Sequence, residues 1–371
     1  MLTPVWRRFW KRTNGQGKKL ESWWERLIVN AVFVIFVFVL LILPHEIGHF
    51  LMAKICGMKV DRFSFGLGPR LWGFKRGETE YRISAIPFGG YVKIAGMEPG
   101  DEHSERGFRK QPLGRRVLVL VAGSVTNYLV AVILLALTFM IGFYTFNLEE
   151  AIIGEVSEGS PAASSGLSPG DRIIEINDES IESWEDLAFS IKNSEEEVLK
   201  LKIQRNDRIF DMKVRPVFYP EAGRRMVGIS PVRVLKREDP ITSLAKGAQE
   251  AFVLTRVIFL AIWGMITGEV PIGGVRGPVG IAQFVGESVR MGVSSFLIVT
   301  ALLSINIGLL NLFPIPALDG GRLLFLLLEG IRGKPLDLKK EELVHYIGFL
   351  ILISLLFLVT YQDVVRLTMG D

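Results

Sequence analysis

Residues 27–56 read LIVNAVFVIFVFVLLILPHEIGHFLMAKIC, an apolar run with two histidines and a glutamate in its second half. About 20 apolar residues suffice for a helix to cross the hydrocarbon core of a bilayer. The stretch therefore predicts a membrane-spanning helix, and with it the fold class. Ionisable side chains at that depth are costly, so His45, Glu46 and His49 need polar partners or a function.

Three further stretches predict membrane-spanning helices. They cover residues 117–146, 294–331 and 343–365, and the middle one is interrupted by NLFPIPALDGGR. Residues 248–267 are also apolar, but Arg256 near their middle favours an interfacial or re-entrant helix over a fifth span. We therefore expect a polytopic α-helical membrane protein with about four transmembrane helices.

Composition and charge agree with a membrane location. Hydrophobic residues make up 49% of the 371 and charged residues 22%, with a net charge of +4. The Lys and Arg residues lie near the apolar stretches, which favours membrane topology over a nucleic-acid partner. Residues 54–116 hold 13 of them and residues 332–340 hold 4, against 7 and 1 in the two terminal tails. The positive-inside rule then places residues 54–116 in the cytoplasm and both termini outside.

The run HEIGH fits H-E-x-x-H, a pattern of helical zinc metalloproteases. An α-helix advances 3.6 residues per turn, so His45 and His49 project from one face and can share a zinc ion. Glu46 between them can take a proton from the attacking water. The alternative is that these side chains only hydrogen-bond to a neighbouring helix.

A catalytic zinc site needs a third protein ligand and an open position for water. Asp319 in PALDGG is the acidic residue deep in another apolar stretch, where Pro314 and Pro316 break the helix. A kinked helix with Asp319 paired to Arg322 is the alternative. The single cysteine, Cys56, excludes a Cys-rich metal site.

Between the first two expected spans, TEYRISAI and YVKIAGM alternate as strands do and are joined by Pro87-Phe88-Gly89-Gly90. We expect a small membrane-associated β-hairpin that reaches toward the reactive residues. A protease holds its substrate extended, and an open strand edge could pair with it beside Gly89 and Gly90. A plain cytoplasmic hairpin is the alternative.

Residues 151–219 differ in character and predict an inserted α+β unit. IIGEV and RIIEIN read as strands, SWEDLAFSIKN as a helix with Ser183 as N-cap, and VLKLKIQRN with IFDMKVRP as a strand pair. The run SPAASSGLSPGDRIIEINDESIESWEDL resembles a bacterial PDZ domain of the protease-associated kind. Such domains bind an extended peptide or chain end between a strand and a helix. The residues expected in that groove are Ile152, Ile153, Gly154, Trp184 and Leu187.

Together these motifs resemble the site-2 protease family of intramembrane zinc metalloproteases, in the bacterial branch of the sigma-E regulator protease. The resemblance covers nearly the whole chain: HEIGH, the FGGYVKIAG hairpin, one PDZ domain, GVRGPVGIA and NLFPIPALDGG. It implies that His45, His49 and Asp319 ligate one Zn²⁺ ion and that Glu46 is the general base. It also implies that Asn311 holds the substrate backbone near the metal. Pro314 is expected beside it.

The implied activity is hydrolysis of peptide bonds within or near the transmembrane segment of single-span proteins. Substrates would be anti-sigma-factor-like proteins already cleaved once, or remnant signal peptides. The resemblance further implies a bacterial inner membrane, with HEIGH toward the cytoplasm and the PDZ domain outside as a substrate filter. Two other classes stay open: a metal-binding membrane transporter or sensor, and a PDZ scaffold with an inactive site.

The expected organisation has five parts. These are a basic tail (1–26), the first two spans with HExxH and the hairpin loop (27–146), the PDZ domain (147–220), a linker with an interfacial or re-entrant helix and the GPVG loop (221–293), and the last two spans with LDG (294–371).

Overall fold

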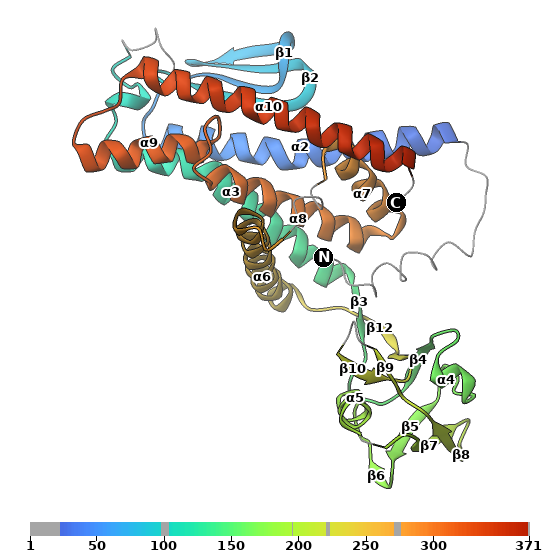
Figure 1. Ribbon diagram of the computed structural model, residues 1–371. Helices are drawn as coiled ribbons and strands as arrows, with labels where there is room; N and C mark the ends of the chain where they lie inside the picture. The colour runs from blue at the N-terminus through green and yellow to red at the C-terminus, as the bar shows by residue number, and fades with distance from the viewer. Residues whose placement is uncertain (1–22, 98–103, 195, 220–222, 271–275, 370–371) are drawn as a thin grey trace. The chain divides into compact units, whose positions relative to one another are not determined.

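The HEIGH run lies on one helix, α2 (Trp23–Ile55), which continues through Pro44. The computed structural model describes residues 23–97, 104–194, 196–219, 223–270 and 276–369. The chain folds as two compact units, residues 142–238 and the remainder (Figure 1).

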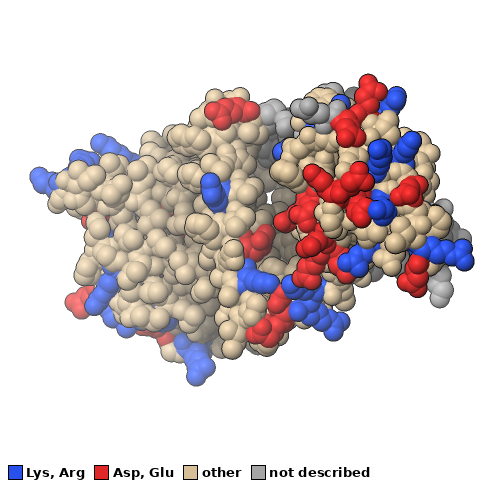
Figure 2. All heavy atoms as spheres, turned by 90° about the horizontal axis from the view of Figure 1, so that it is seen from below, with Lys and Arg blue, Asp and Glu red and all other residues tan. Residues whose placement is uncertain are grey.

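Five helices among the described residues are long and apolar enough to cross a membrane. They are α2, α3 (Leu113–Ile141), α6 (Pro240–Thr267), α8 (Val293–Leu312) and α10 (Leu338–Met369). The larger unit also contains α7 (Pro278–Arg290), α9 (Asp319–Arg332) and a short 3-10 turn, η1 (Phe108–Lys110). Figure 2 shows a broad, largely uncharged surface over the helices, and large apolar side chains such as Trp263 and Phe357 are exposed. The expected multi-span helical architecture is confirmed.

The helices depart most from the expected spans at two places. Gly142, with φ 119°, ends α3 at Ile141, and Phe143–Phe146 form strand β3 instead of helix. The expected span 294–331 is two helices, α8 and α9, because the chain breaks at the prolines between Leu312 and Asp319.

Residues 248–267 are the second part of the continuous helix α6, which qualifies by length and apolarity as a fifth span. Figure 1 nevertheless shows α6 steeply inclined to α2, α3, α8 and α10, which run across the view. Its first turns pack closely on α3, since a Cβ added at Gly247 would lie 2.8 Å from the Val132 carbonyl oxygen.

Helix α3 lies at the centre of the larger unit and contacts α2, α6, α8 and α9. Its approach to α2 is close because α2 carries a glycine at the contact. A Cβ added at Gly48 would lie 2.5 Å from the Ala122 carbonyl oxygen. This contact holds the α2 histidines against α3.

The strands β1 (Val60–Arg76) and β2 (Thr79–Ile94) pair antiparallel and fold back on themselves. Phe63 of β1 lies opposite Val92 on one side and Tyr81 on the other. The two expected strands are therefore the two halves of β2, and each half pairs with β1 rather than with the other half. Among the described residues, the 90–94 half pairs with β1 on one side only, which leaves it as an edge strand.

The smaller unit confirms the secondary structure expected for residues 151–219. It contains a four-stranded sheet in the order β6-β5-β7-β8, whose members are Glu179–Ser180, Arg172–Ile176, Leu199–Arg205 and Arg208–Val214. Helix α5 (Trp184–Asn193) begins at Ser183, whose side chain and that of Asp186 form a capping box. The remaining elements are β4 (Ile153–Val156), α4 (Pro161–Ser164), β9 (Val217–Tyr219), β10 (Arg224–Met226), β11 (Ile229–Pro231) and β12 (Arg233–Lys236).

Candidate metalloprotease active site

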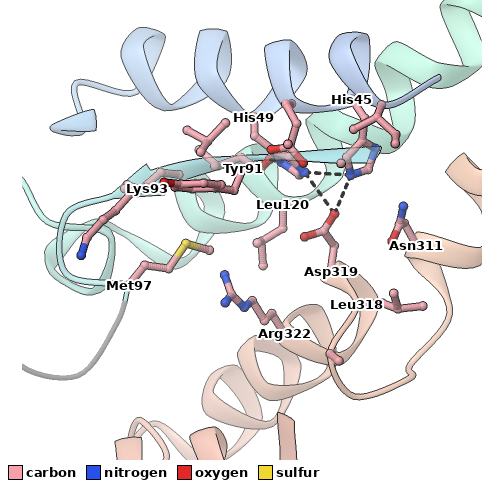
Figure 3. A pocket seen from close by; sticks show the side chains of 18 of the residues that line it. His45, His49, Tyr91, Lys93, Met97, Leu120, Asn311, Leu318, Asp319 and Arg322 are labelled. Carbon is pink, nitrogen blue, oxygen red and sulfur yellow. Dashed lines mark hydrogen bonds and ion pairs between the residues drawn. The ribbon is translucent and has the colours of Figure 1, made fainter. Parts of the chain in front are cut away.

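Three side chains from two separate helices meet at one point in the larger unit (Figure 3). His45 and His49 lie one turn apart on α2, and Asp319 is the first residue of α9. The two Nε2 atoms are 3.1 Å apart. The Oδ2 atom of Asp319 lies 3.2 Å from Nε2 of His45 and 3.1 Å from Nε2 of His49. The geometry therefore brings together the three residues expected to be ligands.

The hydrogen bond on the far side of His49 fixes which ring nitrogen faces this point. Its Nδ1 lies 2.8 Å from the Val119 carbonyl oxygen, which can only accept, so Nδ1 carries the proton. The Nε2 lone pair then faces a second imidazole and a carboxylate, an arrangement that a cation stabilises. A hydrogen bond of this kind orients metal-binding histidines in proteins.

The spacing of these atoms fits zinc. Tetrahedral coordination with bonds of about 2.0–2.1 Å places neighbouring ligand atoms about 3.3 Å apart. The three observed separations, 3.1 to 3.2 Å, are close to that value. Two imidazoles and one carboxylate are also a ligand set that catalytic zinc uses, with one position left for water.

A glycine on α3 makes room for the two histidines. A Cβ added at Gly123 would lie 2.4 Å from Nε2 of His49 and 2.7 Å from Cε1 of His45. No motif in the sequence pointed to Gly123 as a neighbour of the two histidines. Its only signal is the small-residue run AGS in an apolar helix, which has no specific meaning without the fold.

A cavity of about 540 Å³ opens onto this point. It is lined by parts of α2, β2, α3, α8 and α9, and by the loop before Asp319. Glu46 lies in the lining, and a Cβ added at Gly90 would lie 3.1 Å from its Cγ. The general base expected from the sequence therefore borders the same space as the ligands, beneath the edge half of β2.

Some of the residues expected to contact substrate line the cavity and others do not. Asn311, Gly89 and Gly90 line the cavity, whereas Pro314 is not part of the described lining. Arg322 also lines the cavity (Figure 3), but it has no ion pair with Asp319 in the described part of the chain. Asp319 is directed to the two histidines instead, so the alternative of an Asp319–Arg322 pair is wrong.

Two side chains that hold α9 and the loop before it in place could not be identified from the sequence. Arg116 of α3 donates to both carboxylate oxygens of Glu329, at 2.9 and 2.5 Å, and is itself buried. His345 of α10 contacts the loop that precedes Asp319. Neither contact could be found from local spacing, because the partners are far apart in the chain.

Two of the five residues expected in the peptide groove of the smaller unit lie in its interior, and the other three are partly buried. Ile153 and Leu187 are fully buried in the core, and Ile152 forms an isolated bridge with Arg172. A Cβ at Gly154 would lie 2.4 Å from the Pro231 carbonyl oxygen, because β11 pairs with β4 at this point. Trp184 is partly buried against the same core. The side chains of Ile153 and Leu187 are therefore closed to a ligand.

Comparison with known proteins now decides the family. The family model for peptidase family M50 matches residues 33–355, which include all three candidate ligands. The chain belongs to peptidase family M50. As an M50 peptidase it is a multi-pass, intramembrane zinc metalloprotease of the site-2 type, with His45, His49 and Asp319 as its candidate metal site.

Relatives of this M50 peptidase match it over nearly their whole length. A chain of Fusobacterium nucleatum named as a zinc metalloprotease is 37% identical over 332 residues, which cover 88% of this chain and 96% of that one. A similarly named chain of Clostridium acetobutylicum is 34% identical over 336 residues, covering 91% and 97%. The regulator of sigma-W protease RasP of Bacillus subtilis is 28% identical over 422 residues, covering 92% and 100%.

One solved structure resembles part of the chain. It is the PDZ domain of the SdrC-like protein of Listeria monocytogenes, with 20% sequence identity and a TM-score of 0.21. The likeness covers 24% of this chain and 93% of that domain. A TM-score this low does not assign a fold.

Proposed function

We propose that this M50 peptidase cleaves peptide bonds within or near the transmembrane segment of single-span membrane proteins, with one zinc ion held by His45, His49 and Asp319. The observation that carries the proposal is the meeting of these three donor atoms at 3.1–3.2 Å on helices apolar enough to lie in a bilayer. Ionisable residues at such depth are retained for function.

The chemistry divides between the metal and the residues of the cavity. When bound, zinc supplies a Lewis acid that polarises the scissile carbonyl and makes the attacking water more acidic. Glu46 takes the proton of that water and passes it to the leaving amine. Val119 keeps the proton of His49 on Nδ1, so that Nε2 stays available as a ligand.

The substrate backbone is expected to lie along the edge strand formed by residues 90–94. This half of β2 lines the cavity and has β1 on one side only among the described residues. A helical peptide bond is shielded by its own hydrogen bonds, so an unwound segment that pairs with an edge strand is better exposed to attack. Asn311, which lines the cavity from α8, would hold the same backbone by its amide.

For the orientation we propose a bacterial cytoplasmic membrane, with residues 54–116 and the HEIGH end of the site toward the cytoplasm. The excess of Lys and Arg in residues 54–116 and 332–340 supports this orientation. The steep inclination of α6 supports an arrangement in which α6 lies across the bundle. The smaller unit, which we take to be PDZ-like, then lies outside and excludes substrates that keep a large outer domain.

The experiment uses the full-length chain in liposomes with a model single-span substrate, and measures zinc content and cleavage together. Glu46→Gln is expected to keep one zinc per chain and to lose cleavage by about 10²–10⁴-fold, the usual contribution of a general base. Glu149→Gln, which changes an exposed carboxylate outside the cavity lining, is the matched control.

Cleavage at the parental rate by Glu46→Gln would show that Glu46 is not the base. A parental protein that binds no zinc would contradict the metal site itself. Zinc uptake by sealed liposomes that depends on His45, without cleavage, would favour a transporter over a protease.

A further inference from the structure

The loop of residues 313–318 carries the chain from α8 to the metal-facing carboxylate. Its most constrained backbone is at Ala317, whose φ of +76° lies in the left-handed region. A residue with a Cβ adopts this conformation at a cost of about 1–2 kcal/mol, so the surroundings must hold it. Ala317 lies two residues before Asp319, and both line the active-site cavity. The position of the Asp319 carboxylate therefore depends on the contacts that fix the backbone of Ala317.

The last helix supplies that support from behind the loop. The backbone N–H of Ala317 donates to Nδ1 of His345 on α10 at 2.9 Å. The His345 ring also packs edge-on against Phe325 of α9, with ring centroids 5.4 Å apart. One side chain therefore contacts both the loop before Asp319 and the helix that begins with it.

The backbone of α10 approaches the loop as closely as the side chain does. A Cβ added at Gly348, one turn after His345, would lie 2.3 Å from Cβ and 2.8 Å from the carbonyl oxygen of Pro316. Only a glycine allows the helix and loop to be this close. His345 and Gly348 therefore form one continuous contact surface on α10, against which Pro316 and Ala317 pack.

The hydrogen bond also defines the state of the His345 ring. Because Nδ1 accepts, the single proton of the neutral imidazole is on Nε2. An asparagine can place an acceptor oxygen close to the position of Nδ1, whereas a leucine fills similar space without an acceptor. These two substitutions separate the hydrogen bond from the packing of the ring.

We propose that His345 is a positioning residue for the metal site: by accepting the Ala317 N–H it fixes the left-handed turn that brings Asp319 to His45 and His49. The inference rests on the proposed ligand set and goes beyond it, because it assigns a role in metal binding to a helix that carries none of the three ligands. Groups that orient metal ligands typically contribute 10–100-fold to metal affinity.

The test measures the zinc dissociation constant of the full-length protein in detergent by competition with a chelator, together with the visible absorption of the Co²⁺-substituted protein. His345→Leu is expected to weaken zinc binding 10–100-fold and to change the Co²⁺ spectrum. His345→Asn is expected to stay within about threefold of the parental affinity and to keep its spectrum. Tyr346→Phe on the exposed side of α10 is the control.

A second pair of variants keeps the proposal testable if His345→Leu does not fold. Gly348→Ala pushes the loop away while leaving His345 in place, and is expected to weaken zinc binding at least tenfold. Gly330→Ala in α9 is its match, because the added Cβ would meet only side-chain atoms of Leu113 at 3.7 Å or more. It should keep the parental affinity.

Three outcomes would overturn the inference. They are parental zinc affinity in both His345→Leu and Gly348→Ala, equal losses in His345→Leu and His345→Asn, and loss of zinc only through global unfolding of every variant. Failure of the underlying site is distinguishable, because the parental protein would then hold no zinc, or would hold it equally well after Asp319→Ala.

Discussion

The ligands on α2 and the ligand on α9 reach the metal position by different routes. His45 and His49 belong to one uninterrupted helix, so a single helical turn sets their separation. Asp319 begins a new helix after a broken segment and lies 274 positions from His45 in the chain. The relative position of the two histidines is therefore set within one helix, whereas the position of the aspartate depends on how α9 packs against the other helices. Changes remote from the ligands should disturb the aspartate more than the pair.

The largest effect is expected where the first turn of α9 packs against the loop of residues 313–318. A Cβ at Gly320 would lie 1.9 Å from the Phe313 carbonyl oxygen, and backbone cannot move away as a flexible side chain can. Gly320→Ala should therefore open the loop and weaken zinc binding by more than about 100-fold, roughly 2.8 kcal/mol at 1.4 kcal/mol per tenfold. Chelator competition measures it, with Gly114→Ala, whose Cβ meets nothing within 4 Å, as the control. Parental affinity in Gly320→Ala would contradict the loop geometry.

The matched substitution on the histidine side is Gly123→Ala. Its Cβ would meet the metal-facing edges of both imidazoles, and the rings have to turn to avoid it. We expect a loss of zinc affinity of about 10- to 100-fold. Because His49 would lose its alignment with Val119, the Co²⁺ spectrum should change as well. An unchanged spectrum would show that the positions of the two imidazole rings are fixed less tightly than the helix suggests.

A smaller effect is expected from the ion pair that ties α9 to α3. Arg116→Met leaves Glu329 without its bidentate partner, and breaking a buried pair of this kind costs about 3–5 kcal/mol. The Glu329 side chain is 17% exposed, so we expect about 2–3 kcal/mol in a denaturant titration and about a tenfold loss in zinc affinity. The double variant Arg116→Met/Glu329→Leu should recover most of the stability, since no unpaired charge remains. A double variant as unstable as the single one would contradict this account.

The smallest effect is expected in the hairpin, which holds no ligand. Hydrogen bonds from Arg82 and neighbouring arginines lower the pKa of Glu80 to about 2. A carboxyl with a depressed pKa stabilises the fold above its unfolded pKa, near 4.5, and that contribution is lost as the pH falls toward 2. The difference in thermal stability between the parental protein and Glu80→Gln should shrink across that window. Zinc affinity at neutral pH should be the same in both.

The sequence could predict whatever is set by local pattern. HEIGH in an apolar helix specifies its own geometry, and the prolines before Asp319 mark a break that the structure has. The capping box at Ser183 and the strands that follow it were equally local. In each case the interacting groups are a few residues apart, so the spacing contains the information.

The contacts that the sequence could not predict join distant segments. Gly123 beneath the histidines, the Arg116–Glu329 pair and the His345 contact all depend on which helices become neighbours. The same reason explains why the strand pairing around β1 and around β4 could not be predicted. There β1 takes both halves of β2 as partners, and β11 returns from far along the chain to pair with β4.

The contact between His345 and Ala317 has a consequence for the order of biosynthesis. A chain emerging from the ribosome contains all three candidate ligands once Asp319 has been made, but His345, which holds the loop before Asp319, belongs to α10 and is made later. A nascent protein would therefore hold zinc weakly until that helix is inserted. Full metal binding would then require insertion of α10 as well as of the helices that carry the ligands.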